Sequence, residues 1–328
     1  MRHLAITEYG QFVGVTGQRL VVRDADKTVL ETPLSRLRSV AIAKDGVSFS
    51  SNVVLACAAR GIRLYILDWR GQAMAALSGQ HRHGISELRK QQFAYIDSSQ
   101  SRYTAAGMIY GKLRNQRAVL LYFGKYHQQH RDAIRAVAEY IAEFARRLQK
   151  TKWESRENWR EEIMGIEGAA AAAYWQLNAE LGWLGPTFTK RTGRGATDLS
   201  NQLLNYGYAL LASYIWAALD NAGFELYAGV LHAERAGKPS LVLDMMEEYR
   251  PWVVDRQVIT MRSKIKEEKR LDYPLKKQLS NAIQGVMSTR YVHRGKRLKL
   301  ETIVQRQAYR LAGTMVKDQR YQPYRFKW

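Results

Sequence analysis

The chain has 328 residues, of which 46% are hydrophobic and 25% are charged, and these values are ordinary for a globular protein. Its 51 lysines and arginines outnumber its 30 acidic residues, and the resulting net charge of +21 indicates a polyanionic partner, either nucleic acid or an anionic membrane surface. Cys57 is the only cysteine, which excludes an internal disulfide and a multi-thiolate zinc site.

The sequence contains no pattern for export or for membrane insertion. The first residues lack the apolar core of a signal peptide. The most apolar run, residues 208–219, is followed by Asp220 and is too short to cross a bilayer. We therefore expect a soluble, cytoplasmic protein in a reducing compartment.

The beginning of the chain has the pattern of a small β domain. Short runs rich in Val, Ile and Thr are separated by turn signals such as Lys44-Asp45-Gly46. The polar, glycine-containing stretch 78–84 is typical of a linker, so the β domain is placed at residues 1–84. The runs predict strands at residues 4–6, 12–16, 20–23, 28–32, 39–42, 63–67 and 73–77.

From residue 85 onward the pattern is helical. The segment 87–149 contains no proline, and its apolar residues recur at intervals of three and four. Asp198 is the expected cap of a later helix. The predicted fold class is α+β, with a small N-terminal β-sandwich-like domain followed by a larger all-α domain over residues 85–328, whose C-terminal region is basic.

Glu167 lies in a segment of small side chains. It follows Ile166 and precedes the alanine run 169–173, which favours a close contact between helices. The simpler interpretation places Glu167 at the edge of that contact. The alternative is a functional carboxylate, because an unpaired charge in such a setting is costly.

The stretch 231–251 holds the most distinctive group of polar residues. His232 precedes a flexible Ala-Gly-Lys-Pro turn, and Ser240 is expected to cap a helix over residues 241–249. The apolar residues of that helix are distributed around its whole circumference, so most of the helix is expected to be buried.

Three carboxylates belong to this expected helix. Asp244 lies three positions before Glu247 and four before Glu248, so the three share a face. A buried carboxylate requires a paired charge or a bound cation. Carboxylates with a nearby imidazole favour a hard-cation site for Mg²⁺ or Mn²⁺, and pairing with arginines is the plainer alternative.

Two regions are candidates for contact with phosphates. The basic loop 188–196 lacks the spacing of a P-loop but is able to hold phosphates electrostatically. Residues 251–328 contain 19 basic and 6 acidic residues, with aromatic residues between them that are able to stack on unpaired bases. We expect the last residues to be disordered in the free protein. Together with Arg250, which directly precedes the second region, the DNA-binding candidates are Lys190, Arg191, Arg194, Arg290, Arg294, Lys296 and Arg297.

In order and spacing, several motifs along nearly the whole chain resemble those of the CRISPR-associated adaptation integrases. This family consists of metal-dependent DNA endonucleases that insert new spacers into CRISPR arrays. The motifs are Gly-Ile-Arg-Leu-Tyr-Ile-Leu-Asp-Trp-Arg-Gly (61–71), Leu-Arg-Lys-Gln-Gln (88–92), Lys-Leu-Arg-Asn-Gln-Arg (112–117), Gly-Ile-Glu-Gly (165–168) with its alanine run and Tyr-Trp (174–175), residues 201–210, Gly-Val-Leu-His (229–232), Leu-Asp-Met-Met-Glu (243–247), Arg-Pro (250–251) and Val-Asp (254–255).

The resemblance implies a metal site for Mg²⁺ or Mn²⁺. Its ligands fall on Glu167, His232 and Glu247. Asp244 orients the site or contributes a ligand, which makes the catalytic set Glu167, His232, Asp244 and Glu247. The position of Glu247 is often aspartate in the family. Glu248 is the alternative candidate for this outer ligand, which is the second acidic residue of the motif that begins at Leu243 and Asp244.

The resemblance also implies the reaction and the partners. A 3′ hydroxyl of the incoming fragment attacks a phosphodiester at the edge of a repeat, which is a transesterification on double-stranded or branched DNA. The implied assembly has two homodimers around one dimer of a small ferredoxin-like companion nuclease. The alternative function is a non-catalytic nucleic-acid-binding scaffold. Membrane association ranks lower, because the C-terminal tyrosines do not form an amphipathic stripe.

Overall fold

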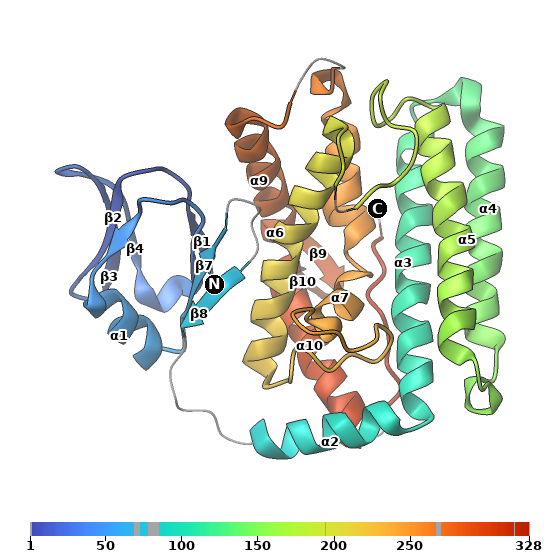
Figure 1. The fold of residues 1–328 in the computed structure, drawn as a ribbon, viewed down its shortest axis with the longest axis horizontal. Helices are drawn as coiled ribbons and strands as arrows, with labels where there is room; N and C mark the ends of the chain where they lie inside the picture. Colours follow the sequence, from blue (N-terminus) through green and yellow to red (C-terminus); the bar gives the residue numbers. More distant parts are fainter. Residues whose placement is uncertain are drawn as a thin grey trace. The chain divides into compact units, whose positions relative to one another are not determined.

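We describe the protein from a computed structural model, which covers residues 2–68, 73–77, 85–193, 195–266, 270–317 and 319–327. The expected linker 78–84 and the DNA-binding candidate Arg194 lie outside the described residues. The chain divides into two compact units, Met1–Gly84 and Ile85–Trp328 (Figure 1). A β-sheet unit followed by a mostly helical unit confirms the expected α+β class.

The first unit consists of two four-stranded sheets, with strand orders β1-β5-β7-β8 and β4-β3-β2-β6. In the first sheet, β1, β5 and β7 are parallel, and the chain from β5 to β7 passes through β6 and α1. Inward-facing residues such as Val13 and Val40 are fully buried in a core of their own. The elements are β1 (Arg2–Ile6), β2 (Gln11–Thr16), β3 (Arg19–Asp24), β4 (Lys27–Pro33), η1 (Leu34–Arg36), β5 (Leu37–Ile42), β6 (Ser48–Phe49), α1 (Ser51–Ala59), β7 (Arg63–Leu67) and β8 (Ala73–Leu77).

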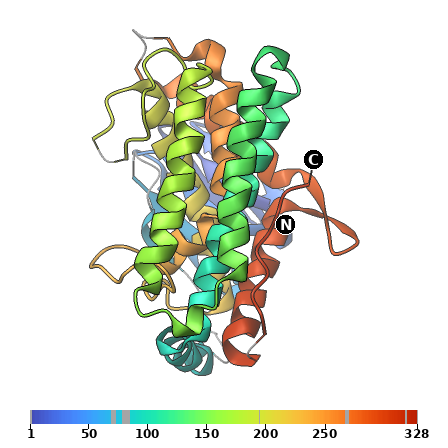
Figure 2. The same ribbon diagram turned by 90° about the vertical axis from the view of Figure 1, so that its right-hand side faces the viewer.

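The second unit begins with long helices, of which α3, α4 and α5 lie side by side (Figures 1 and 2). The helical pattern expected over residues 87–149 is confirmed, although turns divide it into three helices. In α4 the buried residues Ile134, Ala138, Ile141 and Ala145 recur every three or four positions and face the neighbouring helices. The elements are α2 (Ile85–Asp97), α3 (Gln100–Gly124), η2 (Gln128–His130), α4 (Arg131–Lys150), η3 (Trp153–Ser155) and α5 (Trp159–Glu180).

Helix α6 (Leu199–Ala222) packs against α7 (Ser240–Met246), α9 (Tyr273–Ser288) and α10 (Leu300–Lys317). The Asp198 carboxylate accepts a hydrogen bond from the Asn201 amide at 2.9 Å, which confirms the expected cap. Gly207 lets α6 approach the following segment closely, because a Cβ atom there would lie 2.5 Å from Val254 Cγ1. These helices share one continuous core with α3 to α5.

The segment after α6 differs from the single helix expected over residues 241–249. Helix α7 (Ser240–Met246) is followed by a turn at residues 247–249 and by a π-helical turn, η4 (Pro251–Asp255). Ser240 does not cap the helix, because its hydroxyl donates to the Ala233 carbonyl at 3.2 Å. Two short elements follow, α8 (Arg256–Thr260) and η5 (Arg262–Lys264).

The helical unit also contains an antiparallel hairpin, formed by β9 (Arg290–His293) and β10 (Lys296–Lys299). Arg294 and Gly295 at its turn both have positive φ, as expected of a tight two-residue hairpin connection. The hairpin is a small addition to a unit that the sequence predicted to be all-α.

The C-terminal segment, which comprises residues 319–327, lies along α3 (Figures 1 and 2). Tyr321, Tyr324 and Phe326 are each 5% exposed. The expectation of a disordered end is therefore wrong for these residues, because their aromatic rings enter the core. For the same reason, these three rings do not offer free faces for stacking on bases.

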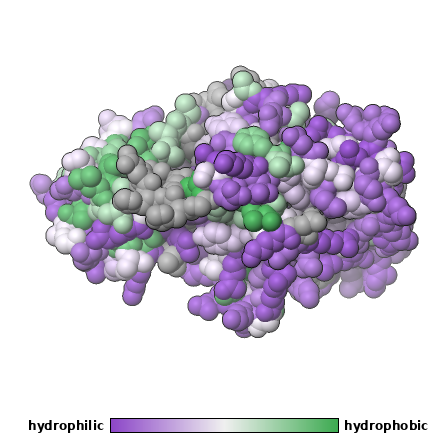
Figure 3. Space-filling model, turned by 90° about the horizontal axis from the view of Figure 1, so that it is seen from below, coloured by the Kyte–Doolittle hydropathy of each residue, from purple (hydrophilic) through white to green (hydrophobic). Residues whose placement is uncertain are grey.

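No helix in the described part of the chain is both long and apolar enough to cross a membrane. In the view of Figure 3, the surface over α3 to α5 is almost entirely hydrophilic.

Candidate active site

Asp244 holds the part of the chain that carries His232. The Asp244 carboxylate is completely buried. Its Oδ2 atom accepts from the amides of Val230 at 2.6 Å and Leu231 at 3.0 Å. Its Oδ1 atom accepts from the His232 amide at 3.0 Å and lies 2.6 Å from His232 Nδ1. Gly229 makes this approach possible, since a Cβ atom there would lie 2.6 Å from Oδ2.

The contact with Asp244 determines which ring nitrogen of His232 is available. Nδ1 faces the carboxylate, and no described residue forms a hydrogen bond with Nε2. The side chain is 34% exposed, so the ring is partly accessible to solvent. Burial lowers the pKa of His232, but the hydrogen bond and charge of Asp244, together with the charge of Glu247, raise the pKa above its ordinary value.

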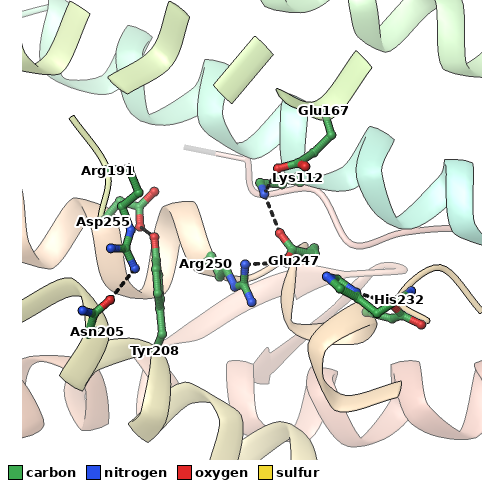
Figure 4. A network of polar contacts seen from close by, with 10 residues as sticks. Lys112, Glu167, Arg191, Asn205, Tyr208, His232, Glu247, Arg250 and Asp255 are labelled. Carbon is green, nitrogen blue, oxygen red and sulfur yellow. Dashed lines mark hydrogen bonds and ion pairs between the residues drawn. The ribbon is translucent and has the colours of Figure 1, made fainter. Parts of the chain in front are cut away.

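Lys112 on α3 lies between Glu167 of α5 and Glu247 of the turn after α7 (Figure 4). Its Nζ atom is 2.5 Å from Glu167 Oε1 and 2.6 Å from Glu247 Oε2. Burial lowers the pKa of Lys112, but the charges of Glu247 and Glu167 outweigh burial and raise the pKa. One carboxylate from α5 and one from the turn after α7 therefore contact the same ammonium group.

Glu247 is more deeply buried than Glu167. Its side chain is 3% exposed and also forms an ion pair with Arg250. Burial raises the pKa of Glu247, but Arg250 and Lys112 outweigh this effect and hold the pKa below its usual value, so the group is ionised. Its Oε2 atom is paired with the ammonium of Lys112 at 2.6 Å.

Glu248 points away from this group. Its carboxylate accepts hydrogen bonds from the Tyr321 hydroxyl and from the Tyr324 amide, the latter at 2.6 Å. Burial raises its pKa to about 8. The expectation that Asp244, Glu247 and Glu248 share one helical face is therefore wrong, because the helix ends at Met246 and the turn sends consecutive side chains in different directions. In this structure Glu248 therefore contacts the C-terminal residues and does not join Glu167 and Glu247 around Lys112.

The chemical types of these side chains suit the ligands of a hard divalent cation. Glu167 and Glu247 offer carboxylate oxygens, and the free Nε2 of His232 suits Mn²⁺ in particular. Glu247 Oε2 is buried with Lys112 as its partner, and the Lys112 ammonium shows that a cation is stable between the two carboxylates. As placed, however, no three carboxylate, imidazole or thiol groups among the described residues stand close enough together to hold an ion.

A second polar group adjoins Arg250 and was not expected from the sequence. The Tyr208 hydroxyl donates to Asp255 Oδ1 at 2.6 Å, and burial raises the pKa of Asp255 to about 6. The guanidinium carbons of Arg191 and Arg250 lie 5.2 and 5.1 Å from the centre of the Tyr208 ring (Figure 4). Tyr208 thus links the base of the 188–196 loop to the ion pairs of Glu247.

The basic candidates fall into two kinds. Arg191 and Arg250 are engaged inside the protein: Arg191 donates to the side-chain oxygens of Asn201 and Asn205, and Arg250 pairs with Glu247. Lys190 is exposed on the loop. The remaining candidates lie exposed on the β9–β10 hairpin, namely Arg290, Arg294, Lys296 and Arg297.

Known proteins match the chain along its length. A family model described as CRISPR associated protein Cas1 matches residues 4–280. The CRISPR-associated endonuclease Cas1 1 of Francisella tularensis subsp. novicida is 43% identical over 328 residues, which is 100% of both chains. The CRISPR-associated endonuclease Cas1 of Hyperthermus butylicus is 31% identical over 297 residues, which is 87% of each chain.

Solved structures share the fold at lower identity. A casposase bound to integration product has a TM-score of 0.77 at 20% identity, with 98% of this chain and 93% of that one covered. A Cas1 protein from Thermotoga maritima has a TM-score of 0.74 at 16% identity, with 98% and 100% covered. A Cas6-RT-Cas1–Cas2 complex contains a chain with a TM-score of 0.78 at 22% identity, of which 36% is covered.

Proposed function

Because the chain belongs to the CRISPR associated protein Cas1 family, we propose that it is a metal-dependent DNA endonuclease and integrase of CRISPR adaptation. It joins the 3′-hydroxyl ends of new spacer DNA to the repeat array by transesterification. The names of its relatives, CRISPR-associated endonucleases and a casposase bound to integration product, support the reaction class.

The observation that carries this proposal is that Glu167 and Glu247 contact the same Lys112 ammonium, and that the free Nε2 side of the His232 ring lies near Glu247. These three side chains would hold a divalent ion. A bound Mg²⁺ or Mn²⁺ supplies Lewis-acid polarisation of the phosphate under attack. Asp244 keeps His232 in the tautomer that leaves Nε2 free, and a ligand oriented in this way is typical of metal sites.

The other residues gather and position the DNA. The protein supplies no covalent nucleophile, since the attacking group is the 3′ hydroxyl of the fragment, and its task is mainly to position the reactants. The net charge of +21 and the exposed arginines of the β9–β10 hairpin favour phosphate contacts that weaken as salt rises.

The proposed partners are double-stranded and branched DNA, a second copy of this chain and a small ferredoxin-like companion nuclease. Two homodimers around one companion dimer is the proposed stoichiometry. The structural relative described as a Cas6-RT-Cas1–Cas2 complex supports a partnership with Cas2.

The purified chain, with its companion nuclease, tests the function directly. We expect joining of a labelled DNA fragment to a repeat-containing duplex with Mn²⁺ or Mg²⁺, and none after chelation with EDTA. DNA binding without any joining or cutting, unchanged by EDTA, would instead identify a scaffold in which the acidic residues only pair with Lys112 and Arg250.

Lys112→Met tests the metal site without an activity assay. Without divalent ions the variant is expected to lose thermal stability, because breaking a buried ion pair costs about 3–5 kcal/mol. Mn²⁺ is expected to raise its Tm more than that of the unmodified protein, because the ion no longer competes with the ammonium. Differential scanning calorimetry with and without Mn²⁺ measures both effects. An equal or smaller Mn²⁺-induced rise in the variant would contradict a cation site between Glu167 and Glu247.

A further inference from the structure

The C-terminal segment packs against one face of α3. Gly107, Gly111 and Asn115 are four residues apart and all meet the segment. A Cβ atom at Gly107 would lie 3.4 Å from Tyr321 Cδ1, and one at Gly111 would lie 2.8 Å from Pro323 Cβ. The segment itself alternates, with Tyr324 and Phe326 buried and the intervening charged residue exposed.

Asn115 joins this segment to the turn that carries Glu247. Its amide is fully buried. Nδ2 donates to the Glu248 carbonyl at 2.6 Å and to the Tyr324 carbonyl at 3.0 Å, and Oδ1 accepts from the Phe326 amide at 2.9 Å. One side chain therefore bonds both the turn and the segment.

The turn at residues 247–249 depends on such contacts. It lies between α7 and η4, where regular helical hydrogen bonds are interrupted. The segment supports it from behind, since the Tyr324 amide donates to Glu248 and the Tyr324 ring stacks on Tyr249 with centroids 6.0 Å apart. The ring of Phe326 stacks on Trp252 of η4 at 5.2 Å.

We propose that the C-terminal segment is a positioning element of the active site, which fixes the turn carrying Glu247 against α3, the helix carrying Lys112. The inference rests on the proposed function, because it assigns Glu247 a role in strand transfer. A misplacement of about 1 Å in a catalytic group is able to reduce a rate by about 100-fold, so loss of this support affects the reaction more than the fold.

Gly111→Ala in the full-length protein is the principal test. The added methyl group would meet Pro323 at 2.8 Å and Glu248 Cγ at 3.0 Å, so the segment or the turn must move, whereas alanine favours the helix itself. Gly285→Ala in α9 is the matched control, because a Cβ atom there has no neighbour within 4 Å.

Two measurements separate a positioning role from a purely structural one. In Gly111→Ala, hydrogen exchange of the Tyr324 and Phe326 amides is expected to be at least ~10-fold faster. The strand-transfer rate at saturating DNA is expected to fall at least ~10-fold, with a higher Mn²⁺ requirement, because Glu247 is no longer held in place. The DNA dissociation constant and the circular dichroism spectrum are expected to stay as in Gly285→Ala.

Other outcomes overturn the inference. Asn115→Leu is the second variant, because it removes the hydrogen bonds that Asn115 makes to the turn and the segment. If either variant releases the segment and keeps the unmodified rate, the segment does not position the site. If the segment stays protected in both variants, these contacts with α3 do not hold it, which also overturns the inference. Arg320→Ala combined with Lys327→Ala removes exposed charge from the segment. Weaker DNA binding and slower transfer in this pair, with normal exchange, would assign the segment to DNA contact instead. Absence of transfer by the unmodified protein refutes the proposed function, and the exchange data remain interpretable.

Discussion

We expect strand transfer to fall by at least ~100-fold when Glu167, Glu247 or His232 is substituted. This is the upper end of the 10–100-fold loss that is typical of residues outside the metal's own ligands. The informative substitutions are Glu167→Gln, Glu247→Gln and His232→Ala. The two glutamines preserve shape and the contact with Lys112 but remove the negative charge that binds a divalent ion. Rates are measured on the fragment-plus-repeat substrate with Mn²⁺ and with Mg²⁺.

Glu234→Gln is the control for these substitutions. Glu234 lies exposed two residues after His232 and carries the same charge near the same loop. It is expected to keep the unmodified rate. Full activity in all three site variants would show that the ion, if any, is held elsewhere. A loss in Glu234→Gln equal to theirs would point to the general charge of the region.

Asp244→Asn is expected to cost about 3–5 kcal/mol of unfolding free energy, the range for breaking a buried pair and leaving its partners unsatisfied. Each carboxylate oxygen accepts from two donors. Whichever way the asparagine amide turns, its NH₂ group faces two N–H groups. Urea denaturation at pH 7 measures the loss.

The same substitution is expected to release the His232 ring, so the Mn²⁺ requirement for strand transfer rises. Asp97→Asn serves as the control, since Asp97 is exposed at the end of α2 and surface changes usually stay within about 0.5 kcal/mol. A loss below about 1 kcal/mol in Asp244→Asn would mean that the four contacts do not hold the His232 loop as described.

Lys112 shows why part of the site was not predictable. Its position within an apolar helical pattern was visible, and it belongs to one of the motifs that carry the family resemblance. What it faces depends on the packing of α3 against α5 and the turn after α7, and these segments are far apart in the sequence. Tyr208 and Asp255 were missed for the same reason, although both lie in quoted motifs.

The amino-acid sequence by itself determined the two-part α+β organisation, the family, and Glu167, His232, Asp244 and Glu247 as the candidates for the site. Alternation, helical spacing and motif order are local properties, so they can be read from one chain. Only the tertiary structure decided that Asp244 serves His232, that Glu248 turns toward the C-terminal segment, and that this segment is buried. The physical reason is that the direction of a side chain at a helix end, and the burial of a terminus, depend on contacts between distant segments.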